Sequence, residues 1–395
     1  MLFISHSAGL TGAPMMLLHF LRWLKANIDL EFVVVLREGG NLGSAFSKLA
    51  PTWQYSGCRV GRLSDTWMKI IRRIGWRGIR GREDQQGSLL ERLAQLNFDL
   101  VYSNTITNGA VLDWLEPLGV PVLTHVHEMS HWIEACGPEN LEAVKKHSVA
   151  YIAASHAVKR ELDAKWGIPA SKITVVHEFI PTNIPVPDSK RNAEIRRQLD
   201  IPLDAFLVVG SGVETWRKGK DLFVDLANEL NRSLTAQDIR LVWVGAWEHM
   251  EHERQFRERL HSEGLERQVL FIGQVTNPLD YFAAADVFAM TSREDPYPLV
   301  CLEAALMGLP VLCFAGAGGV PEFVEDDAGM VFEYLNLPEM AQGIIELIEN
   351  PETRRRLGRS ATEKVRRRHD VNIGGQQLWL EICSCLESNP GRSDG

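Results

Sequence analysis

The stretch TSREDPYPLVCLEAALMGLPVLCF, residues 291–314, joins an acidic turn, a helix and a short apolar strand. Glu294 and Asp295 stand near its start, and Glu303 follows eight positions after Asp295. This spacing predicts one carboxylate at the start of the helix and another further along it. A helix N-terminus attracts phosphate through its free N–H groups and its dipole, and neighbouring carboxylates can accept hydrogen bonds from ribose or sugar hydroxyls. The stretch therefore indicates a nucleotide-sugar site.

The same carboxylates allow two other interpretations. Either Ser292 or Asp295 could cap the helix and leave Glu303 exposed. The two carboxylates could also act as the acid and the base of a glycoside hydrolase. The cations Arg217 and Lys218 argue against a hydrolase, because that class of enzyme needs no diphosphate site.

Short apolar runs alternate with helical patterns along most of the chain, which predicts an α/β protein with parallel sheets. The expected strands of the first half are Leu2–Ser5, Leu30–Leu36, Asp99–Ser103, Val120–Thr124, Val149–Ala153 and Ile173–Val176. Those of the second half are Phe206–Gly210, Arg240–Val244, Val269–Ile272, Val287–Met290, Val311–Phe314 and Met330–Phe332. Each half begins with a strand, a glycine-containing turn and a helix.

The expected architecture is two Rossmann-like domains facing across a cleft, where ligands of α/β sheets collect. The proline-rich residues 181–192, PTNIPVPDSKRN, form the expected irregular linker. We expect an N-terminal domain over residues 1–182 and a C-terminal domain over residues 193–371. Residues 372–395 include an amphipathic helix, with Leu378, Leu380 and Ile382, that we expect to pack back on the first domain.

Composition narrows the class of protein. The chain has 395 residues, of which 45% are hydrophobic and 24% charged, as in ordinary globular proteins. It has no apolar run of about 20 residues, the length that a membrane-spanning helix needs. A formal net charge of −9 argues against general nucleic-acid binding. The absence of a basic leader and the scattered spacing of the six cysteines predict a cytoplasmic protein.

One basic segment, residues 59–82, stands out from this acidic chain. It carries Trp67 and Trp76 among Arg72, Arg73 and Arg77. Tryptophan, apolar residues and arginine together are typical of a helix that docks on an anionic membrane surface. A basic loop that holds a polyanionic acceptor and a plain solvated loop are the alternatives. The first interpretation predicts a protein attached peripherally to the inner face of a membrane.

Two loops have the residues expected of a phosphate site. Gly9 and Gly12 follow the first strand, and glycines let the backbone approach a ligand closely. The loop is not G-x-G-x-x-G, and Arg37 rather than an acidic residue follows the second strand, which disfavours a nicotinamide dehydrogenase. Arg217 and Lys218 follow a strand of the second half and precede a helix, where they could bind a diphosphate. A tight turn and a solvated basic loop are the respective alternatives.

His125 and His127 lie near the end of one expected strand, and strand alternation places them on the same side. A histidine there could hydrogen-bond a sugar hydroxyl or polarise a reacting group. It could equally be a buried histidine whose hydrogen bonds are satisfied. No third metal ligand accompanies the pair in the sequence.

These segments together resemble the GT4-type retaining glycosyltransferases with the two-domain GT-B fold. The most specific segment is SREDPYPLVCLEA, residues 292–304, which is similar to the E-x7-E segment of that family. SHSAGLTGAPMMLLHFL at the start, the HVHE block at residues 125–128, SHAVKRELDAKWGIPASKITVV and VTNPLDYFAAADVF add to the resemblance, which covers nearly the whole chain.

The resemblance implies roles for individual residues. Glu303 would bind the donor ribose, Lys218 the diphosphate, and His127 would face the reacting sugar. Asp295, or Glu294 after a slip of one residue, would fill the first acidic position near the donor sugar. Further donor contacts are implied for Gly9, Gly12, Arg217, Gly273, Val275, Leu299 and Val300. The chain departs from the family pattern at Val213, where the family has arginine, and at Pro298, where it has glycine.

The implied activity is retaining transfer of a sugar from a nucleotide-diphosphate sugar to a glycan or lipid-linked acceptor, in cell-surface polysaccharide synthesis. The N-terminal domain would bind the acceptor and the C-terminal domain the donor. No metal or other cofactor and no covalent nucleophile are expected. A sugar-nucleotide epimerase and a non-catalytic protein that binds sugar nucleotides or glycans are the alternatives.

Overall fold

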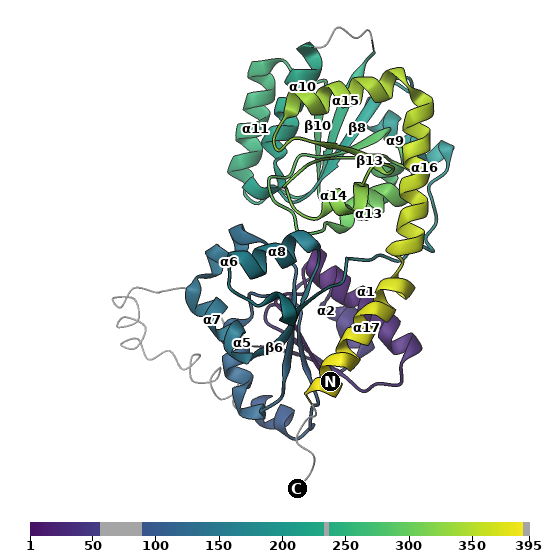
Figure 1. The fold of residues 1–395 in the computed structure, drawn as a ribbon. Helices are drawn as coiled ribbons and strands as arrows, with labels where there is room; N and C mark the ends of the chain where they lie inside the picture. The colour runs from purple at the N-terminus through teal and green to yellow at the C-terminus, as the bar shows by residue number, and fades with distance from the viewer. Residues whose placement is uncertain (56–88, 233–236, 390–395) are drawn as a thin grey trace, which may run out of the picture. The chain divides into compact units, whose positions relative to one another are not determined.

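The structure of the protein is a computed structural model, which describes residues 1–55, 89–232 and 237–389. The chain forms two compact units, each with its own sheet (Figure 1). Unit 1 comprises Met1–Ala153, Leu162–Val175 and Gly375–Gly395, and unit 2 comprises Ala154–Glu161 and Val176–Gly374. The predicted docking residues Trp67, Arg72, Arg73, Trp76 and Arg77 lie outside the described residues. The predicted domain limits at residues 182, 193 and 371 stay predictions.

The described part of unit 1 is built on a parallel seven-stranded sheet in the order β3-β2-β1-β4-β5-β6-β7. The strands are β1 (Leu2–Ser5), β2 (Val33–Leu36), β3 (Thr52–Gln54), β4 (Val101–Ser103), β5 (Val122–Val126), β6 (Ser148–Ala153) and β7 (Ile173–Val175). Its central strands are fully buried, as expected of a parallel sheet covered on both faces. Parallel strands end at one common edge, so the loops after β1, β2, β4 and β5 meet there.

Helices connect these strands. They are α1 (Gly12–Asn27), α2 (Gly43–Leu49), α5 (Gly109–Leu115), α6 (Ser130–Cys136) and α7 (Pro138–His147), with short 3-10 turns at Glu116–Leu118 and Ala170–Lys172. Helix α8 (His156–Ala164) belongs to unit 2 up to Glu161 and to unit 1 from Leu162. The aromatic rings of Phe3, Phe20 and Tyr102 pack α1 against the sheet, with centroids 5.3 to 6.3 Å apart. This packing fixes the start of α1 at the carboxyl edge of the sheet.

Unit 2 is built on a parallel six-stranded sheet in the order β10-β9-β8-β11-β12-β13 within its described residues. The strands are β8 (Phe206–Ser211), β9 (Ile239–Val244), β10 (Val269–Gly273), β11 (Val287–Met290), β12 (Val311–Phe314) and β13 (Gly329–Phe332). The helices are α9 (Ser189–Gln198), α10 (Lys220–Arg232), α11 (Met250–Glu263), α12 (Pro278–Ala283), α13 (Leu299–Leu306), α14 (Val320–Val324), α15 (Leu337–Glu349) and α16 (Pro351–Arg368), with a 3-10 turn at Trp216–Lys218. The last helix, α17 (Val371–Ser388), begins in unit 2 and belongs to unit 1 from Gly375 onward.

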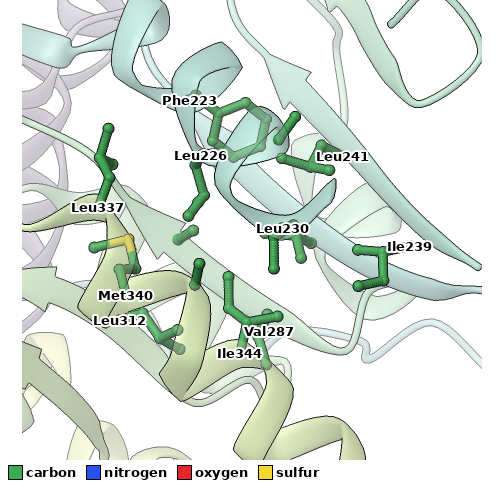
Figure 2. Packing of buried hydrophobic residues seen from close by; sticks show 14 of the residues in the cluster. Phe223, Leu226, Leu230, Ile239, Leu241, Val287, Leu312, Leu337, Met340 and Ile344 are labelled. Carbon is green, nitrogen blue, oxygen red and sulfur yellow. The ribbon is translucent and has the colours of Figure 1, made fainter. Parts of the chain in front are cut away.

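The core of unit 2 packs two helices on this sheet (Figures 1 and 2). α10 contributes Phe223, Leu226 and Leu230, which recur at the spacing of a single helix face. α15 contributes Met340 and Ile344, which meet them over the strands. The arrangement fixes the N-terminus of α10 at the carboxyl ends of the strands, beside the loop that carries Lys218.

The parallel α/β prediction is confirmed, and every predicted strand is present with its ends shifted by at most a few residues. The sequence analysis missed β3, a short strand at the edge of the sheet with partly exposed side chains. The prediction that residues 181–192 are irregular is wrong at its end, because α9 begins at Ser189. Asp188 caps that helix by accepting a hydrogen bond from the Arg191 backbone N–H at 2.9 Å.

The proposed cap of the acidic stretch is also wrong. α13 begins at Leu299 and Pro298 is its N-cap residue, so neither Ser292 nor Asp295 caps it. In the C-terminal helix α17, Leu378 and Ile382 are buried whereas Leu380 is 58% exposed. Leu380 therefore does not belong to the buried face that the sequence suggested.

Candidate active site

Unit 2 brings Lys218 and Asp295 together at the carboxyl edge of its sheet. The Lys218 Nζ lies 2.5 Å from Asp295 Oδ2, and an Arg217 Nη1 lies 3.5 Å from Asp295 Oδ1. The side chain of Asp295 is only 5% exposed. Burial lowers the pKa of Lys218, while the charge of Asp295 opposes that shift. A partly buried cation pair with one carboxylate leaves excess positive charge, which suits an anionic ligand such as a diphosphate.

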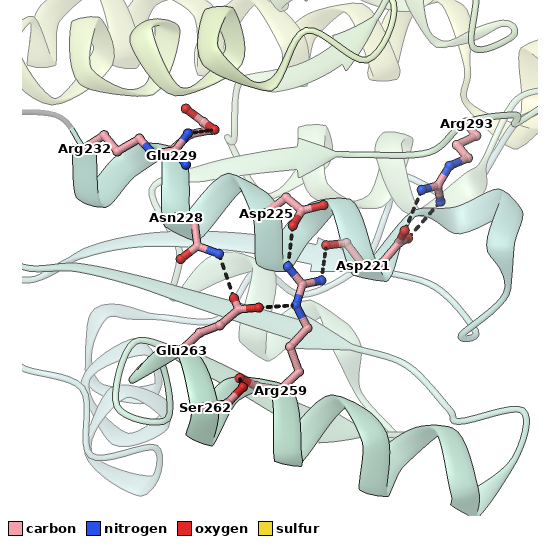
Figure 3. A network of polar contacts seen from close by, with 9 residues as sticks. All are labelled: Asp221, Asp225, Asn228, Glu229, Arg232, Arg259, Ser262, Glu263 and Arg293. Atoms are coloured by element: carbon pink, nitrogen blue, oxygen red, sulfur yellow. Dashed lines mark hydrogen bonds and ion pairs between the residues drawn. The ribbon is translucent and has the colours of Figure 1, made fainter.

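Hydrogen bonds join the two loops that carry these charges. The backbone N–H of Arg293 donates to the Arg217 carbonyl at 2.8 Å, and the Arg217 guanidinium donates to the Glu294 carbonyl at 2.8 Å. The Arg293 guanidinium in turn makes a bidentate ion pair with Asp221, in the first turn of α10 (Figure 3). The positions of Lys218 and Asp295 are therefore set by a rigid, cross-linked pair of loops.

Gly219 is required for this approach of the loops. Its φ of +66° is a left-handed conformation that side chains rarely adopt. An added Cβ would lie 2.0 Å from the Thr291 carbonyl oxygen, which no side chain could tolerate. The Thr291 hydroxyl also donates to the Gly219 carbonyl at 2.8 Å. Glycine at this position lets the Lys218 loop contact the end of β11.

Glu303 lies within α13, past the first turn that Leu299 and Val300 open. Burial raises the pKa of its carboxyl group to about 7. Within the ranges that the structure describes, no protein group donates a hydrogen bond to this carboxylate. A partly buried carboxyl group without a protein donor is suited to accept hydrogen bonds from ligand hydroxyls.

Glu294 and Asp295 differ clearly in their contacts. The Asp295 carboxylate is the one that pairs with Lys218, and its backbone joins Gly318 through an isolated parallel bridge. Glu294 uses its backbone carbonyl to accept from Arg217. The geometry therefore favours Asp295 for the first acidic position.

The predicted contact region for the donor base lies at the end of β10. Gly273 has a φ of +76°, and its carbonyl accepts a hydrogen bond from the Gly245 N–H at 2.9 Å. A Cβ at Gly273 would meet no atom within 4 Å, so open space lies beside this backbone. Val275 follows two residues later, outside the strand.

Unit 1 places His127 at the carboxyl edge of its sheet, just past the end of β5. The His127 Nε2 lies 3.0 Å from Asn104 Oδ1, and its backbone N–H donates to Glu128. Its ring centroid lies 4.0 Å from that of His125, so the predicted same-side placement is correct. His125 is buried, and its Nδ1 lies 2.5 Å from the Tyr102 hydroxyl oxygen. Burial, with a contribution from His127, lowers the pKa of His125 well below its usual value, so His125 is a neutral core residue.

The glycine-containing loop after β1 occupies the same edge of unit 1. The Gly9 N–H lies 3.3 Å from the Ser7 hydroxyl, and Gly12 begins α1. Leu10 and Gly12 are exposed, and a Cβ at Gly12 would meet no atom within 4 Å. The helix N-terminus therefore stands open beside this loop.

One group in the described part of unit 2 has the composition of a metal site. His156, His177 and Glu322 bring ligand atoms within 4.8 Å of one another. The Glu322 carboxylate already accepts from the backbone N–H groups of His156 and Ala157 at 2.9 and 2.8 Å, and lies 2.9 Å from the His177 Nε2. These bonds cap α8 and explain the cluster without an ion. The expectation that the reaction needs no metal stays a prediction.

Family models match both halves of the chain. Residues 191–364 match the glycosyl transferases group 1 model, and residues 59–184 match the Glycosyltransferase Family 4 model. The chain belongs to the GT4-type glycosyltransferases, as the acidic stretch and the loops suggested.

Curated relatives share parts of the chain. It is 27% identical over 234 residues to a D-inositol 3-phosphate glycosyltransferase of Corynebacterium aurimucosum, which covers 58% of this chain and 53% of that protein. It is 32% identical over 177 residues to the lipopolysaccharide core biosynthesis glycosyltransferase LpsD of Rhizobium meliloti, covering 44% and 48%. The matches with the first relatives span only 37% to 59% of their lengths.

Solved structures show the fold. Anabaena HepE in complex with UDP-glucose is similar with a TM-score of 0.78 and 21% identity, over 97% of this chain and 99% of that one. WaaG, a glycosyltransferase involved in lipopolysaccharide biosynthesis, has a TM-score of 0.70 and 13% identity, over 99% and 100%. The GT-B prediction, with its two Rossmann-like domains, is confirmed.

The predicted site residues thus fall into two groups. Arg217, Lys218 and Asp295 are in direct contact in unit 2, while His127 belongs to a separate hydrogen-bond network in unit 1. Sequence analysis missed Gly219 and Asn104. A glycine between Lys218 and Lys220 was the signal in the sequence that could have identified Gly219. Nothing in the sequence pairs Asn104 with His127.

Proposed function

We propose that the protein is a retaining glycosyltransferase that moves a sugar from a nucleotide-diphosphate sugar to a glycan or lipid-linked acceptor. The observation that carries this proposal is the Arg217–Lys218–Asp295 cluster at the carboxyl edge of the unit 2 sheet. Relatives that act in lipopolysaccharide core and O-antigen biosynthesis support a role in cell-surface polysaccharide synthesis.

The charges suit the departure of a diphosphate. Cleavage of the bond between the anomeric carbon and the diphosphate places new negative charge on a phosphate oxygen. Lys218 and Arg217 would stabilise that charge, which is the largely electrostatic form of catalysis expected in a preorganised site. The acceptor oxygen would form the new bond from the same face, and its proton would pass to the departing phosphate.

The remaining residues would position the donor. Above its raised pKa, the Glu303 carboxylate would accept hydrogen bonds from the ribose hydroxyls. Gly273 and Val275 would contact the base through their backbone, with Leu299 and Val300 at the start of α13 also contacting the donor. Asp295 would contact the donor sugar, and His127 would face the reacting sugar in the role that the family resemblance implies.

Two other functions would give different products from a sugar nucleotide. An epimerase would convert the sugar nucleotide without any acceptor, whereas a non-catalytic binding protein would bind it and release it unchanged. The predicted basic segment 59–82 favours a transferase, because an epimerase needs no membrane or acceptor docking. The structure describes no helix of the length and apolarity that crossing a membrane requires.

The first experiment is a thermal-shift panel of nucleoside diphosphates and their sugar derivatives, in buffer with EDTA. Uridine diphosphate comes first, because the HepE structures hold UDP and UDP-glucose. A ligand that binds only the folded state raises the Tm by mass action. We expect nucleotides of one base to raise the Tm clearly, and Lys218→Ala to abolish that rise. In a separate transfer reaction followed by NMR, we expect the transferred sugar to keep the anomeric configuration that it has in the donor. No shift with any nucleotide would contradict the proposal.

A further inference from the structure

A second polar cluster lies at the carboxyl edge of the unit 1 sheet. His6 follows β1, Arg37 follows β2 and Asn104 follows β4. The strand order β2-β1-β4 makes these three loops neighbours on one edge. The same edge carries the Gly9 loop and His127, so the cluster lies beside the residues that the family resemblance places near the donor and its reacting sugar.

Backbone hydrogen bonds hold the loops after β1 and β2 together. The Arg37 N–H donates to the Ser5 carbonyl at 2.8 Å, and the Glu38 N–H donates to the His6 carbonyl at 3.0 Å. The Ala8 N–H returns a bond to the Glu38 carbonyl at 3.1 Å. The backbone of Arg37 is therefore fixed relative to that of His6, and this fixes the point from which the Arg37 side chain extends.

The Arg37 guanidinium is oriented by neutral groups. Its Nη1 donates to the Thr107 carbonyl at 2.5 Å and to the Thr107 hydroxyl at 3.2 Å. No carboxylate within residues 1–55, 89–232 or 237–389 pairs with it. An arginine has five N–H donors, so Nε and Nη2 keep donors that no described group accepts. The half-buried positive charge lacks a counterion in the part of the protein that the structure describes.

Histidine adds a second donor to this cluster. The His6 Nδ1 is buried and has no hydrogen-bond partner among the described residues. Burial lowers the pKa of His6 to about 4, and the charges of Arg37 and His127 contribute to the shift. His6 therefore senses the Arg37 charge, and its neutral ring is available to donate a hydrogen bond rather than a second charge.

Glu128 does not neutralise the cluster. Its carboxylate accepts hydrogen bonds from the Thr105 hydroxyl and from the backbone N–H groups of Ile106 and His127. Three donors satisfy this charge locally. The carboxylate stabilises the loop after β4 instead of pairing with the guanidinium.

The residue after the second strand of a Rossmann-like sheet commonly selects its ligand by charge. An acidic residue there accepts hydrogen bonds from ribose hydroxyls, whereas an arginine nearby donates hydrogen bonds to a phosphate. We propose that Arg37 and His6 bind an anionic group, a phosphate or a carboxylate, on the acceptor. The inference rests on the proposed transferase function, because it takes unit 1 as the acceptor-binding half.

Anion binding by the full-length protein tests this inference without knowledge of the acceptor. The probes are inorganic phosphate and malonate, titrated separately at constant ionic strength and followed by NMR chemical shifts. Lys218→Ala serves as the background, because it removes the competing anion site of unit 2. We expect Arg37→Met to weaken binding of at least one probe about tenfold, the loss expected for a charge-assisted hydrogen bond. The probe that responds distinguishes a phosphate-bearing acceptor from a carboxylate-bearing one.

Two variants control the result. Arg92→Met removes an exposed arginine of unit 1 and should leave binding unchanged. Arg37→Lys keeps the charge without the planar fork, so its affinity should fall between the Lys218→Ala background and the same background with Arg37→Met, even if Arg37→Met lowers the Tm. Binding that is independent of Arg37, or no binding of either probe, would overturn the inference. Nucleotide binding, which depends on Lys218, separates that outcome from failure of the proposed function.

Discussion

The carboxyl edges of the two sheets differ in the charged groups that they carry. In unit 2, Lys218, Arg217 and Asp295 form a compact charged cluster with a buried carboxylate. In unit 1, the Arg37 guanidinium is held by Thr107 without a carboxylate partner among the described residues, and the His127 Nε2 lies 3.0 Å from Asn104 Oδ1. A ligand with several negative charges suits the two cations of the first arrangement, and a ligand with hydroxyls and one anionic group suits the second. The comparison therefore favours the diphosphate donor in unit 2.

The two edges also differ in what holds them. Unit 2 uses ion pairs: Arg293 and Asp221 join the acidic loop to α10, and Arg259 of α11 pairs with Asp225 of α10 and with Glu263 of its own helix (Figure 3). Unit 1 uses backbone hydrogen bonds between the loops after β1 and β2. Salt screens partly exposed ion pairs more than backbone hydrogen bonds. The order of the unit 2 loops should therefore depend more on ionic strength.

Lys218→Ala should reduce sugar transfer more than any other single substitution considered, because it removes the main charge opposite the departing diphosphate. We expect kcat/KM for sugar transfer to fall by about 10³-fold, in the range known for loss of a preorganised electrostatic contact. Transfer from a radiolabelled donor measures the loss, and circular dichroism checks the fold. Lys190→Ala, at an exposed position of α9, is the matched control. A loss of less than about threefold would remove Lys218 from the mechanism.

His127→Ala should have the next largest effect, and it acts from unit 1. We expect kcat to fall by about 10²-fold, the lower range for loss of a positioned catalytic side chain. The donor Kd should change little, because the diphosphate cluster lies in unit 2. Asn104→Ala should give a smaller loss of kcat, because Asn104 only orients the histidine. Equal losses of kcat and donor affinity in His127→Ala would contradict this division.

Glu303→Gln should weaken donor binding by about tenfold, the cost of losing a charged hydrogen-bond acceptor. Wild-type affinity should rise with pH through about 7 as the carboxyl group ionises, and the variant should lack this dependence. Isothermal titration at pH 6 and pH 8 measures both effects. A donor Kd that changes with pH equally in both proteins would assign the titration to another group.

The same substitution should stabilise the apo protein. Because burial raises the pKa of Glu303 from 4.5 to about 7, its ionisation costs stability as pH rises through that interval. The gain in Tm from Glu303→Gln should therefore be small near pH 4.5 and largest above pH 7. A lower Tm for the variant at pH 8 would show that the carboxylate has a stabilising partner.

Reversing Arg72, Arg73 and Arg77 to Glu should have the smallest effect on the fold and on donor binding. Its effect should appear in binding to vesicles that contain anionic lipid, measured by co-sedimentation. Each basic residue near such a surface contributes about 1 kcal/mol, so the reversal should abolish binding. Unchanged sedimentation would reject the membrane prediction and leave the acceptor-holding loop and the solvated loop as interpretations of residues 59–82.

Sequence patterns predicted the regular parts of the fold and the location of the charged loops. The apolar strands and the amphipathic helices each have a clear hydrophobic period in the sequence, and Arg217 with Lys218 identified a loop after β8. The missing parts depend on contacts between distant residues. β3 is too short and exposed to have a clear period, and the bond between Asn104 and His127 exists only because β4 and β5 are neighbours. Burial of Glu303 likewise follows from tertiary packing.

The route of the chain limits how the protein can be recombined with its relatives. Residues 375–395 belong to unit 1, although they follow the whole of unit 2 in sequence. Gly375 lies so close to Trp23 that a Cβ would come within 2.7 Å of its ring, and a Cβ at Gly374 would come within 2.1 Å of the Phe179 ring in unit 2. A hybrid enzyme made by one crossover near residue 180 would give unit 1 a foreign C-terminal helix. Exchange of donor specificity therefore requires a second crossover after Gly374, so that the original helix returns to its own partner.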